Sequence, residues 1–295
     1  MINIRIAGVP EHFNIPWYLA LETHKFTAQG IDLQWIDVPE GTGKMNKMLR
    51  EGDVDMAVIL TAGIAVDIDK GNPSRIIQGF VKSPLIWGIH TRPGFEWNSL
   101  HSIADGRIAI SRKGSGSHFF PLMIADEIGI DHNLLNFVEV GTIHAAEQAF
   151  INNEADIFLW EKFMTEPLVN KGSMHFNGEW IPPWPAFVLV CNEQFAIHNQ
   201  KHIKTLQAVI NRTCRYWMKN RNAPNIVAER YKLDIEKANE WFQHTKWCTT
   251  HTIFKPEIEN MLAKLYNADF ITKPLTTNDV CVNFANIKDR PGTIY

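Results

Sequence analysis

Residues 43–60 read GKMNKMLREGDVDMAVIL, and residues 144–160 read HAAEQAFINNEADIFLW. Each stretch begins with apolar residues at the spacing of an amphipathic helix. A short polar turn, an aspartate and a hydrophobic strand follow. The two aspartates, Asp55 and Asp156, are 101 residues apart. The same order of helix and buried strand thus occurs twice, 101 residues apart. This repeat predicts two α/β lobes of related design.

Strand and helix patterns alternate on both sides of these stretches. Asn14 and Pro16 are typical of a helix start, and Gly30 is typical of a helix end, so we expect a helix over 14–29. The alternation predicts parallel strands joined by right-handed crossovers, and the chain after residue 200 reads as almost all helix. The predicted strands are 2–7, 32–38, 55–60, 107–111, 136–140, 155–160 and the Pro-rich segment 181–191, and the late helices are 200–219, 223–230, 235–244 and 256–265.

The composition is that of a globular protein with nearly balanced charge. The 295 residues include 29 Lys+Arg and 32 Asp+Glu, a net charge of −3, and 45% are hydrophobic. This balance excludes a disordered chain and a coiled coil, and the lack of Lys/Arg runs argues against a nucleic-acid partner. No segment reaches the ~20 apolar residues of a membrane helix, so we expect no membrane insertion.

The cysteines and the first residues indicate the compartment. The four cysteines have no CxxC spacing, so they are interpreted as free thiols. The opening MINIRIAGVP reads as a strand and not as a signal peptide. We therefore expect a cytoplasmic protein, or a periplasmic one if a signal has been removed.

Four segments of the chain carry a resemblance to a known family. They are PEGTGKMNKMLREGDVDMAVILTAG (39–63), AISRKGSGSHFFPLMIADEIGI (109–130), FLWEKF (158–163) and PPWPAFVLV (182–190). Over roughly residues 1–220 the chain resembles the type II periplasmic-binding-protein fold, and within it the solute-binding family of aliphatic sulfonates, nitrate and thiamine-pyrimidine precursors.

The resemblance implies a fold class and a division of the chain. It implies an α/β protein of two doubly wound lobes with a ligand cleft between them. Lobe 1 would comprise residues 1–88 and 187–295, including the C-terminal helices, and lobe 2 would comprise residues 89–186. Two crossing strands would join the lobes, and we place them near Trp87–Arg92 and Pro182–Ala186.

The loops that follow the predicted strands carry the candidate ligand-binding residues. Open α/β sheets bind ligands beyond the carboxyl ends of their strands, near helix N-termini. The most distinct of these loops is Gly114–His118, because glycine lets a backbone approach a ligand and serine caps a helix whose N–H groups attract acceptors. We expect Glu161 and His118 to face each other in the cleft. The predicted ligand-binding residues are Glu11, His12, Thr42, Thr61, Ser115, Ser117, His118, Thr142, Trp160, Glu161 and Trp184.

Each of these residues has a structural interpretation as well. Glu161 is alternatively a loop carboxylate that pairs with Lys162 or caps the next helix. His118 is alternatively a surface histidine, and Trp160 and Trp184 are alternatively plain packing at a lobe interface. The Gly114–His118 loop is alternatively an ordinary helix entry.

Catalytic and metal motifs are not found in the sequence. It contains no HExxH, no GxSxG and no zinc-like Cys/His spacing, so no catalytic residue, metal or cofactor is predicted. Glu11, Glu40, Glu161, His12 and His118 could nevertheless meet in the cleft, where they could do acid–base work or bind a metal.

The chemistry of the predicted cleft indicates the ligand. Helix N-termini favour acceptor groups, glutamates favour donor or cationic groups, and tryptophans favour a flat surface. We therefore expect a small polar or heteroaromatic compound, held by a binding protein that closes like a hinge. Its other partner would be the membrane component of an ABC transporter, if the protein is exported. The alternatives are a cytosolic biosynthetic enzyme of the thiamine-pyrimidine or menaquinone type, or a ligand sensor.

Overall fold

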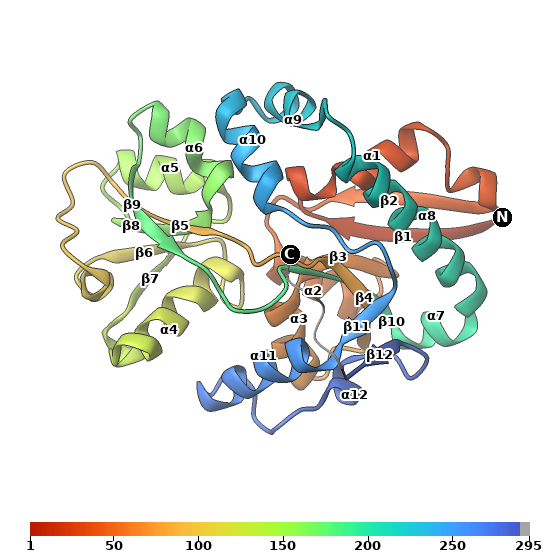
Figure 1. Cartoon of the computed structure of the whole chain (residues 1–295). Helices are drawn as coiled ribbons and strands as arrows, with labels where there is room; N and C mark the ends of the chain where they lie inside the picture. The colour runs from red at the N-terminus through yellow and green to blue at the C-terminus, as the bar shows by residue number, and fades with distance from the viewer. Residues whose placement is uncertain (290–295) are drawn as a thin grey trace.

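The chain folds into two five-stranded sheets, each covered by helices, as seen in the computed structural model, which describes residues 1–289 (Figure 1). The first sheet has the strand order β2-β1-β3-β10-β4, and the second has the order β7-β6-β8-β5-β9. The strands of the first sheet are β1 (Ile2–Gly8), β2 (Ile31–Asp37), β3 (Met56–Leu60), β4 (Ser74–Val81) and β10 (Phe187–Asn192). Those of the second are β5 (Trp87–Thr91), β6 (Arg107–Ile110), β7 (Asn136–Glu139), β8 (Ile157–Glu161) and β9 (His175–Trp180).

Both sheets follow one plan. In the first, β1 is parallel to β2 and β3, and β10 runs antiparallel to β3 and β4. In the second, β6 is parallel to β7 and β8, and β5 runs antiparallel to β8 and β9. The predicted α/β fold with two lobes of related design is thus confirmed.

The helices of the two lobes also correspond. The crossovers of the first sheet include α1 (Ile15–Glu22), α2 (Thr42–Glu51) and α3 (Thr61–Asp69), and those of the second include α4 (Gly116–Ile128), α5 (Ile143–Ile151) and α6 (Lys162–Asn170). Short 3-10 turns lie at η1 (His12–Asn14), η2 (Thr27–Gln29), η3 (Leu100–Ala104) and η4 (His132–Leu134). The later elements are α7 (Glu193–His198), α8 (Gln200–Met218), α9 (Ala223–Tyr231), α10 (Ile235–His244), β11 (Thr252–Phe254), α11 (Lys255–Asn267), α12 (Thr277–Val280) and β12 (Asn286–Lys288).

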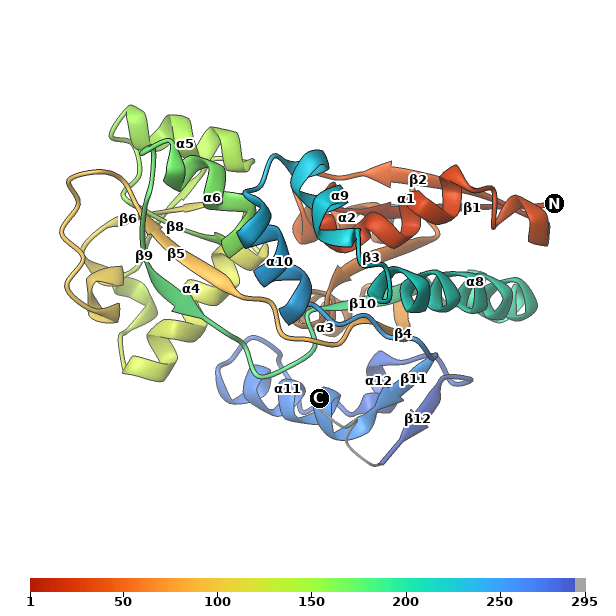
Figure 2. The same ribbon diagram turned by 45° about the horizontal axis from the view of Figure 1, so that its top comes forward.

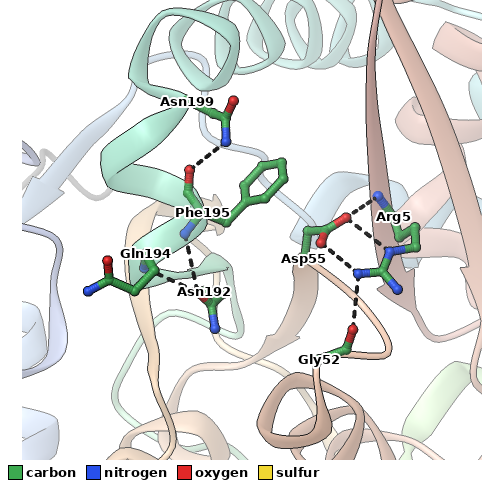
Figure 3. A network of polar contacts seen from close by, with 7 residues as sticks. All are labelled: Arg5, Gly52, Asp55, Asn192, Gln194, Phe195 and Asn199. Atoms are coloured by element: carbon green, nitrogen blue, oxygen red, sulfur yellow. Dashed lines mark hydrogen bonds and ion pairs between the residues drawn. The ribbon is translucent and has the colours of Figure 1, made fainter.

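The two aspartates of the sequence repeat hold equivalent strands together. The Asp55 carboxylate accepts the backbone N–H of Arg5 at 2.8 Å and its guanidinium at 2.8 Å, while the Asp55 N–H donates to the Arg5 carbonyl (Figure 3). In the second lobe, Asp156 accepts the backbone N–H of Arg107 at 2.9 Å and its Nε at 2.8 Å. Asp55 therefore links β1 to the start of β3, and Asp156 links the start of β6 to the start of β8. In each lobe the two linked strands are parallel neighbours.

The second of these clamps carries an additional cation. Arg92 Nε donates to Asp156 at 2.6 Å, and its backbone N–H donates to the Asp156 carbonyl. Burial opposes ionisation of Asp156, but the hydrogen bonds from Arg107 and Arg92 outweigh it and hold the pKa of Asp156 well below its usual range. In the first lobe the carbonyl of Asp55 accepts instead from the backbone N–H of Asn192, whose side chain caps α7.

The chain passes between the sheets twice. It leaves the first sheet after Val81 and enters the second at Trp87, and it returns between Trp180 and Phe187. The first passage therefore precedes the Trp87–Arg92 segment where we expected it, because Trp87–Thr91 pairs with β8 and β9 as a strand of the second sheet. The second passage includes the expected segment 182–186. The predicted lobe boundaries at 88/89 and 186/187 stay a prediction.

Two other segments differ from expectation. The helix expected over 14–29 ends at Glu22, because His24 adopts a positive φ of 50° and the chain then forms η2. The tail after Lys273, expected to be irregular, contains α12 and the strand β12, which pairs with β11. The four cysteines are free, as predicted. Over residues 1–289, no helix combines the length and the apolar character that crossing a membrane requires.

Helix α10 lies between the two lobes. Figure 2 shows it beside α6 of the second lobe, with α9 and the first sheet on its other side. Trp241 of α10 is buried and packs in the first lobe against Phe13 and Trp247. A helix from the C-terminal part of the chain thus covers the junction of the lobes.

Candidate functional site

A small cavity lies between the lobes, at the carboxyl ends of strands from both sheets. Its volume is about 40 Å³, room for only a few water molecules. A ligand of metabolite size therefore requires the lobes to separate before it enters. The cavity is lined by Val9, Glu11, Gly41, Thr42, Leu60, Leu85, Trp87, Ser111, Ser115, Gly116, Ser117, Trp160, Glu161 and Phe187.

Helix N-termini from both lobes meet at this cavity. Gly41 and Thr42 begin α2 in the first lobe, and Ser115 to Ser117 begin α4 in the second. Glu161 ends β8 and caps α6, because its Oε2 accepts the backbone N–H of Met164 at 2.8 Å. The expected arrangement of strand ends and helix N-termini is therefore present in the structure, and Glu161 both caps a helix and lines the cavity.

Two buried acidic side chains line the cavity. Glu11 is 8% exposed and Glu161 is 3% exposed. Burial, followed by the nearby charge of Glu161, raises the pKa of Glu11 to about 8, so at neutral pH Glu11 is mostly a neutral carboxyl group and the charge lies on Glu161. Within the described chain, no lysine or arginine is among the residues that line the cavity. The cavity is thus suited to hydrogen-bond donors and cations rather than to anions.

His12 supports Glu161 from outside the cavity. The His12 side chain is completely buried, and its Nε2 lies 3.5 Å from Oε2 of Glu161. Its ring packs against Trp241 of α10 at 4.2 Å between centroids and against Phe13 at 4.8 Å. Both ring nitrogens lack a hydrogen bond within the described residues. This packing joins α10 to the cavity wall through one histidine.

Trp87 and Trp160 both line the cavity, and each has a flat ring with a polar N–H at its edge. The Trp87 and Trp160 rings lie 6.4 Å apart in an edge-to-face arrangement, and both Nε1 atoms are buried without a hydrogen-bond acceptor in residues 1–289. A ligand acceptor would satisfy either donor. Gly116 is required beside them, because an added Cβ there would lie 2.5 Å from the Trp87 ring.

The serine hydroxyls are already engaged within their own loop. Ser115 Oγ donates to the Arg112 carbonyl at 2.7 Å, and Ser117 Oγ accepts the Ser111 backbone N–H at 2.9 Å. They shape the entry to α4 and line the cavity at the same time.

Five of the predicted ligand-binding residues lie outside the cavity lining, and His12, described above, is one of them. Thr61 Oγ1 donates to the carbonyls of Pro185 and Ala186 and so fixes the returning passage. Thr142 caps α5 by accepting the Ala145 N–H, and Trp184 is buried against Trp180. His118 is the fifth, and its contacts are described next.

His118 does not meet Glu161 at the cavity. Its Nδ1 accepts the Gly114 N–H at 3.2 Å, and its ring contacts the edge of Phe137. Burial, followed by the charges of Lys113 and Lys70, lowers the pKa of His118, in line with the neutral ring that Nδ1 needs as an acceptor. His118 thus closes its own loop.

Trp87 is the main cavity residue that the sequence analysis missed. We placed it in a crossing strand, whereas it begins β5 and faces the N-terminus of α4. The available signal was its aromatic ring directly after Leu85 and Ile86, at the start of an apolar strand that enters a lobe. Leu85 and Phe187, which flank the two passages, also line the cavity.

The comparisons with known proteins agree with this architecture. The family model described as NMT1/THI5 like matches residues 10–223. No curated protein matches the chain. The conserved CA3427 gene product of Candida albicans, which exhibits the generic periplasmic binding protein fold, has a TM-score of 0.87 and 21% identity over 100% of both chains.

Two bacterial binding proteins have the same fold at lower identity. The alkanesulfonate-binding protein SsuA from Xanthomonas axonopodis pv. citri, bound to MOPS, has a TM-score of 0.78 and 14% identity, covering 95% of this chain and 97% of that one. The periplasmic nitrate-binding protein NrtA from Synechocystis PCC 6803 has a TM-score of 0.70 and 13% identity, covering 93% and 83%. The predicted periplasmic-binding-protein fold is confirmed.

Proposed function

The chain belongs to the NMT1/THI5-like family, and on this premise we propose that it is a solute-binding protein whose lobes close on one small molecule. The observation that carries the proposal is the cavity between the lobes, built from strand ends and helix N-termini of both. The alkanesulfonate- and nitrate-binding proteins that share the fold support it by analogy of architecture.

The chemistry of the residues that line the cavity favours a small polar or heteroaromatic compound with a protonated or donor nitrogen. Glu11 and Glu161 provide acceptors, Trp87 and Trp160 provide flat surfaces, and the helix N-termini at Thr42 and Gly116 favour an acceptor group on the same molecule. A sulfonate or nitrate would meet the charge of Glu161 and no lysine or arginine of the described lining. We therefore propose a ligand class different from those of the two bacterial binding proteins.

The test is a thermal-shift and calorimetric screen of small heteroaromatic amines against alkanesulfonates and nitrate. We expect the amines to raise the melting temperature. At a ligand concentration of 100 times Kd, the bound ligand should increase the free energy of unfolding by about 2.7 kcal/mol. Binding of sulfonate or nitrate alone would contradict the proposed ligand class.

The fate of the bound molecule separates the proposed function from the enzyme interpretation. A binding protein returns its ligand unaltered after incubation, whereas a biosynthetic enzyme on the same scaffold converts it. Fractionation of the native cells, combined with capture of an ABC transporter component, distinguishes a transport protein from a cytosolic sensor.

Closure of the lobes should depend on an ion pair between α6 and α10. Lys162 Nζ lies 3.0 Å from Glu240 Oε1 and 3.2 Å from Glu179 Oε2. Lys162 directly follows Glu161, and Glu240 directly precedes the tryptophan that packs on His12. We expect Lys162→Ala and Glu240→Gln each to weaken ligand binding by up to about fivefold, since partly exposed pairs contribute about 0.2–1 kcal/mol.

A double-mutant cycle on ligand affinity measures this coupling. Because Lys162 also contacts Glu179, the Glu179→Gln variant is the matched control: it removes a contact within the second lobe only. Effects of Lys162→Ala and Glu240→Gln that add without coupling would show that the pair does not contribute to closure.

A further inference from the structure

A stretch without acidic residues runs from Gln194 to Ala228, in a chain whose net charge is −3. It contains six cations, Lys201, Lys204, Arg212, Arg215, Lys219 and Arg221. Most of this stretch is α8, whose apolar residues Ile203, Leu206, Ile210, Cys214 and Trp217 are buried. The four cations within α8 therefore lie on its solvent side, and Lys219 and Arg221 follow its C-terminal end.

Part of this helix forms one side of a groove. The groove has a volume of about 830 Å³ and lies between α8 and the η2 turn. The apolar residues of its lining are Ala28, Ala208 and Val209. The lining also includes Lys25, Lys201, Lys204 and Arg212, and it contains no acidic residue. The acid closest to Lys25 in sequence, Glu22, pairs with Arg230 instead.

The groove is remote from the ligand cavity. Its η2 side adjoins the amino end of β1, where the Ile2 N–H donates to the Gly30 carbonyl, whereas the cavity lies past the carboxyl end of that strand. Figures 1 and 2 both place α8 on the side of the first lobe that faces away from the second lobe. Occupation of the groove is thus compatible with either an open or a closed cavity.

We propose that this groove is a docking surface for an acidic amphipathic segment of a partner protein. Residues 200–212 of α8 provide a face about 18 Å long at 1.5 Å per residue, enough for a few turns of a partner helix. Acidic side chains on that helix would pair with the four cations, and its apolar side chains would contact Ala28, Ala208 and Val209.

The test measures binding of labelled peptides by fluorescence anisotropy. The probe is a synthetic peptide of glutamate and leucine with leucines at i, i+3, i+4 and i+7, and its comparator is the same composition in scrambled order. Vesicles of phosphatidylglycerol and phosphatidylcholine test the membrane alternative. The groove variant carries Lys204→Glu and Arg212→Glu, and the matched control carries Lys219→Glu and Arg221→Glu, two exposed cations of the same acid-free stretch outside the groove.

We expect the patterned peptide to bind the wild type and the control variant equally, and the groove variant at least about tenfold more weakly, with the difference shrinking at high salt. The scrambled peptide should bind the wild type more weakly than the patterned one. Equal binding of the patterned peptide to both double variants, or preference for the vesicles, would overturn the proposal. Ligand binding in the cavity should be the same in all three proteins, so this result is independent of the proposed function.

Discussion

Replacing Glu161 with glutamine should weaken ligand binding by about 1–3 kcal/mol, or roughly 5- to 150-fold. Glu161 is 3% exposed at the end of β8, so a ligand donor that loses this carboxylate is left in a cavity with room for little water to replace it. Glutamine keeps an oxygen that accepts the Met164 N–H and so preserves the cap of α6. Isothermal calorimetry with the identified ligand measures the loss, and urea unfolding checks that stability is little changed.

The control for Glu161→Gln must be a carboxylate that does not contact the cavity. Glu139 ends β7 in the same lobe and is exposed, so Glu139→Gln changes the charge of the lobe without touching the site. Lys162, the sequence neighbour of Glu161, is unsuitable because it pairs with Glu240 of α10. Equal affinities of Glu161→Gln and Glu139→Gln would identify Glu161 as only a helix cap.

Glu11 should make the unliganded protein less stable as the pH rises. Its pKa in the folded protein is raised from 4.5 to about 8, so between these values the folded state holds a proton that the unfolded state has released. The free energy of unfolding therefore falls as pH rises through this window and levels off above it. A shift of this size corresponds to a change on the order of a few kcal/mol.

Glu11→Gln should remove this pH dependence. Other groups titrate in the same range, including His90, whose burial lowers its pKa to about 4. These groups are present in both proteins, so the difference in unfolding free energy between wild type and variant reports on Glu11 alone. Urea unfolding near pH 4.5 and above pH 8 should show the stability difference shifting in favour of the variant as the pH rises between these values. Parallel curves for the two proteins would mean that Glu11 ionises normally in the fold.

The repeat in the sequence predicted the architecture because it has a physical cause in the chain. Asp55 and Asp156 each sit where a helix ends and a buried strand begins, and in both lobes the aspartate accepts the N–H and guanidinium of an arginine on the adjacent parallel strand. Local patterns of this kind follow from periodicity and capping, which neighbouring residues determine. The passage between lobes was misplaced because a short apolar segment reads equally as a strand or a linker.

The strand-end rule predicted part of the cavity for a similar reason. Glu11, Thr42, Ser115, Ser117, Trp160 and Glu161 come from such ends, and the structure gathers them around one space. Thr61, Thr142 and His118 come from equivalent positions but bind their own or adjacent backbone, since a hydroxyl or imidazole serves a cap as well as a ligand.

The contribution of α10 could not be found from sequence. Trp241 packs on His12 although 229 residues separate them along the chain, and Glu240 pairs with Lys162 across 78 residues. Such contacts arise from how the C-terminal helices return over the junction of the lobes, which no local pattern encodes. Through these contacts α10, a helix outside the two sheets, is connected to Glu161 in the cavity lining.

Native mass spectrometry of the protein purified from its own cells tests the central claim most directly, with the released molecule identified by its mass and fragmentation. We predict a single small molecule per chain that carries a basic or donor nitrogen. It should be retained in Glu139→Gln and lost from Glu161→Gln, because the two cavity carboxylates hold it. A molecule that stays bound to Glu161→Gln, or a sulfonate or nitrate as the bound species, would contradict a donor-binding cavity between the lobes.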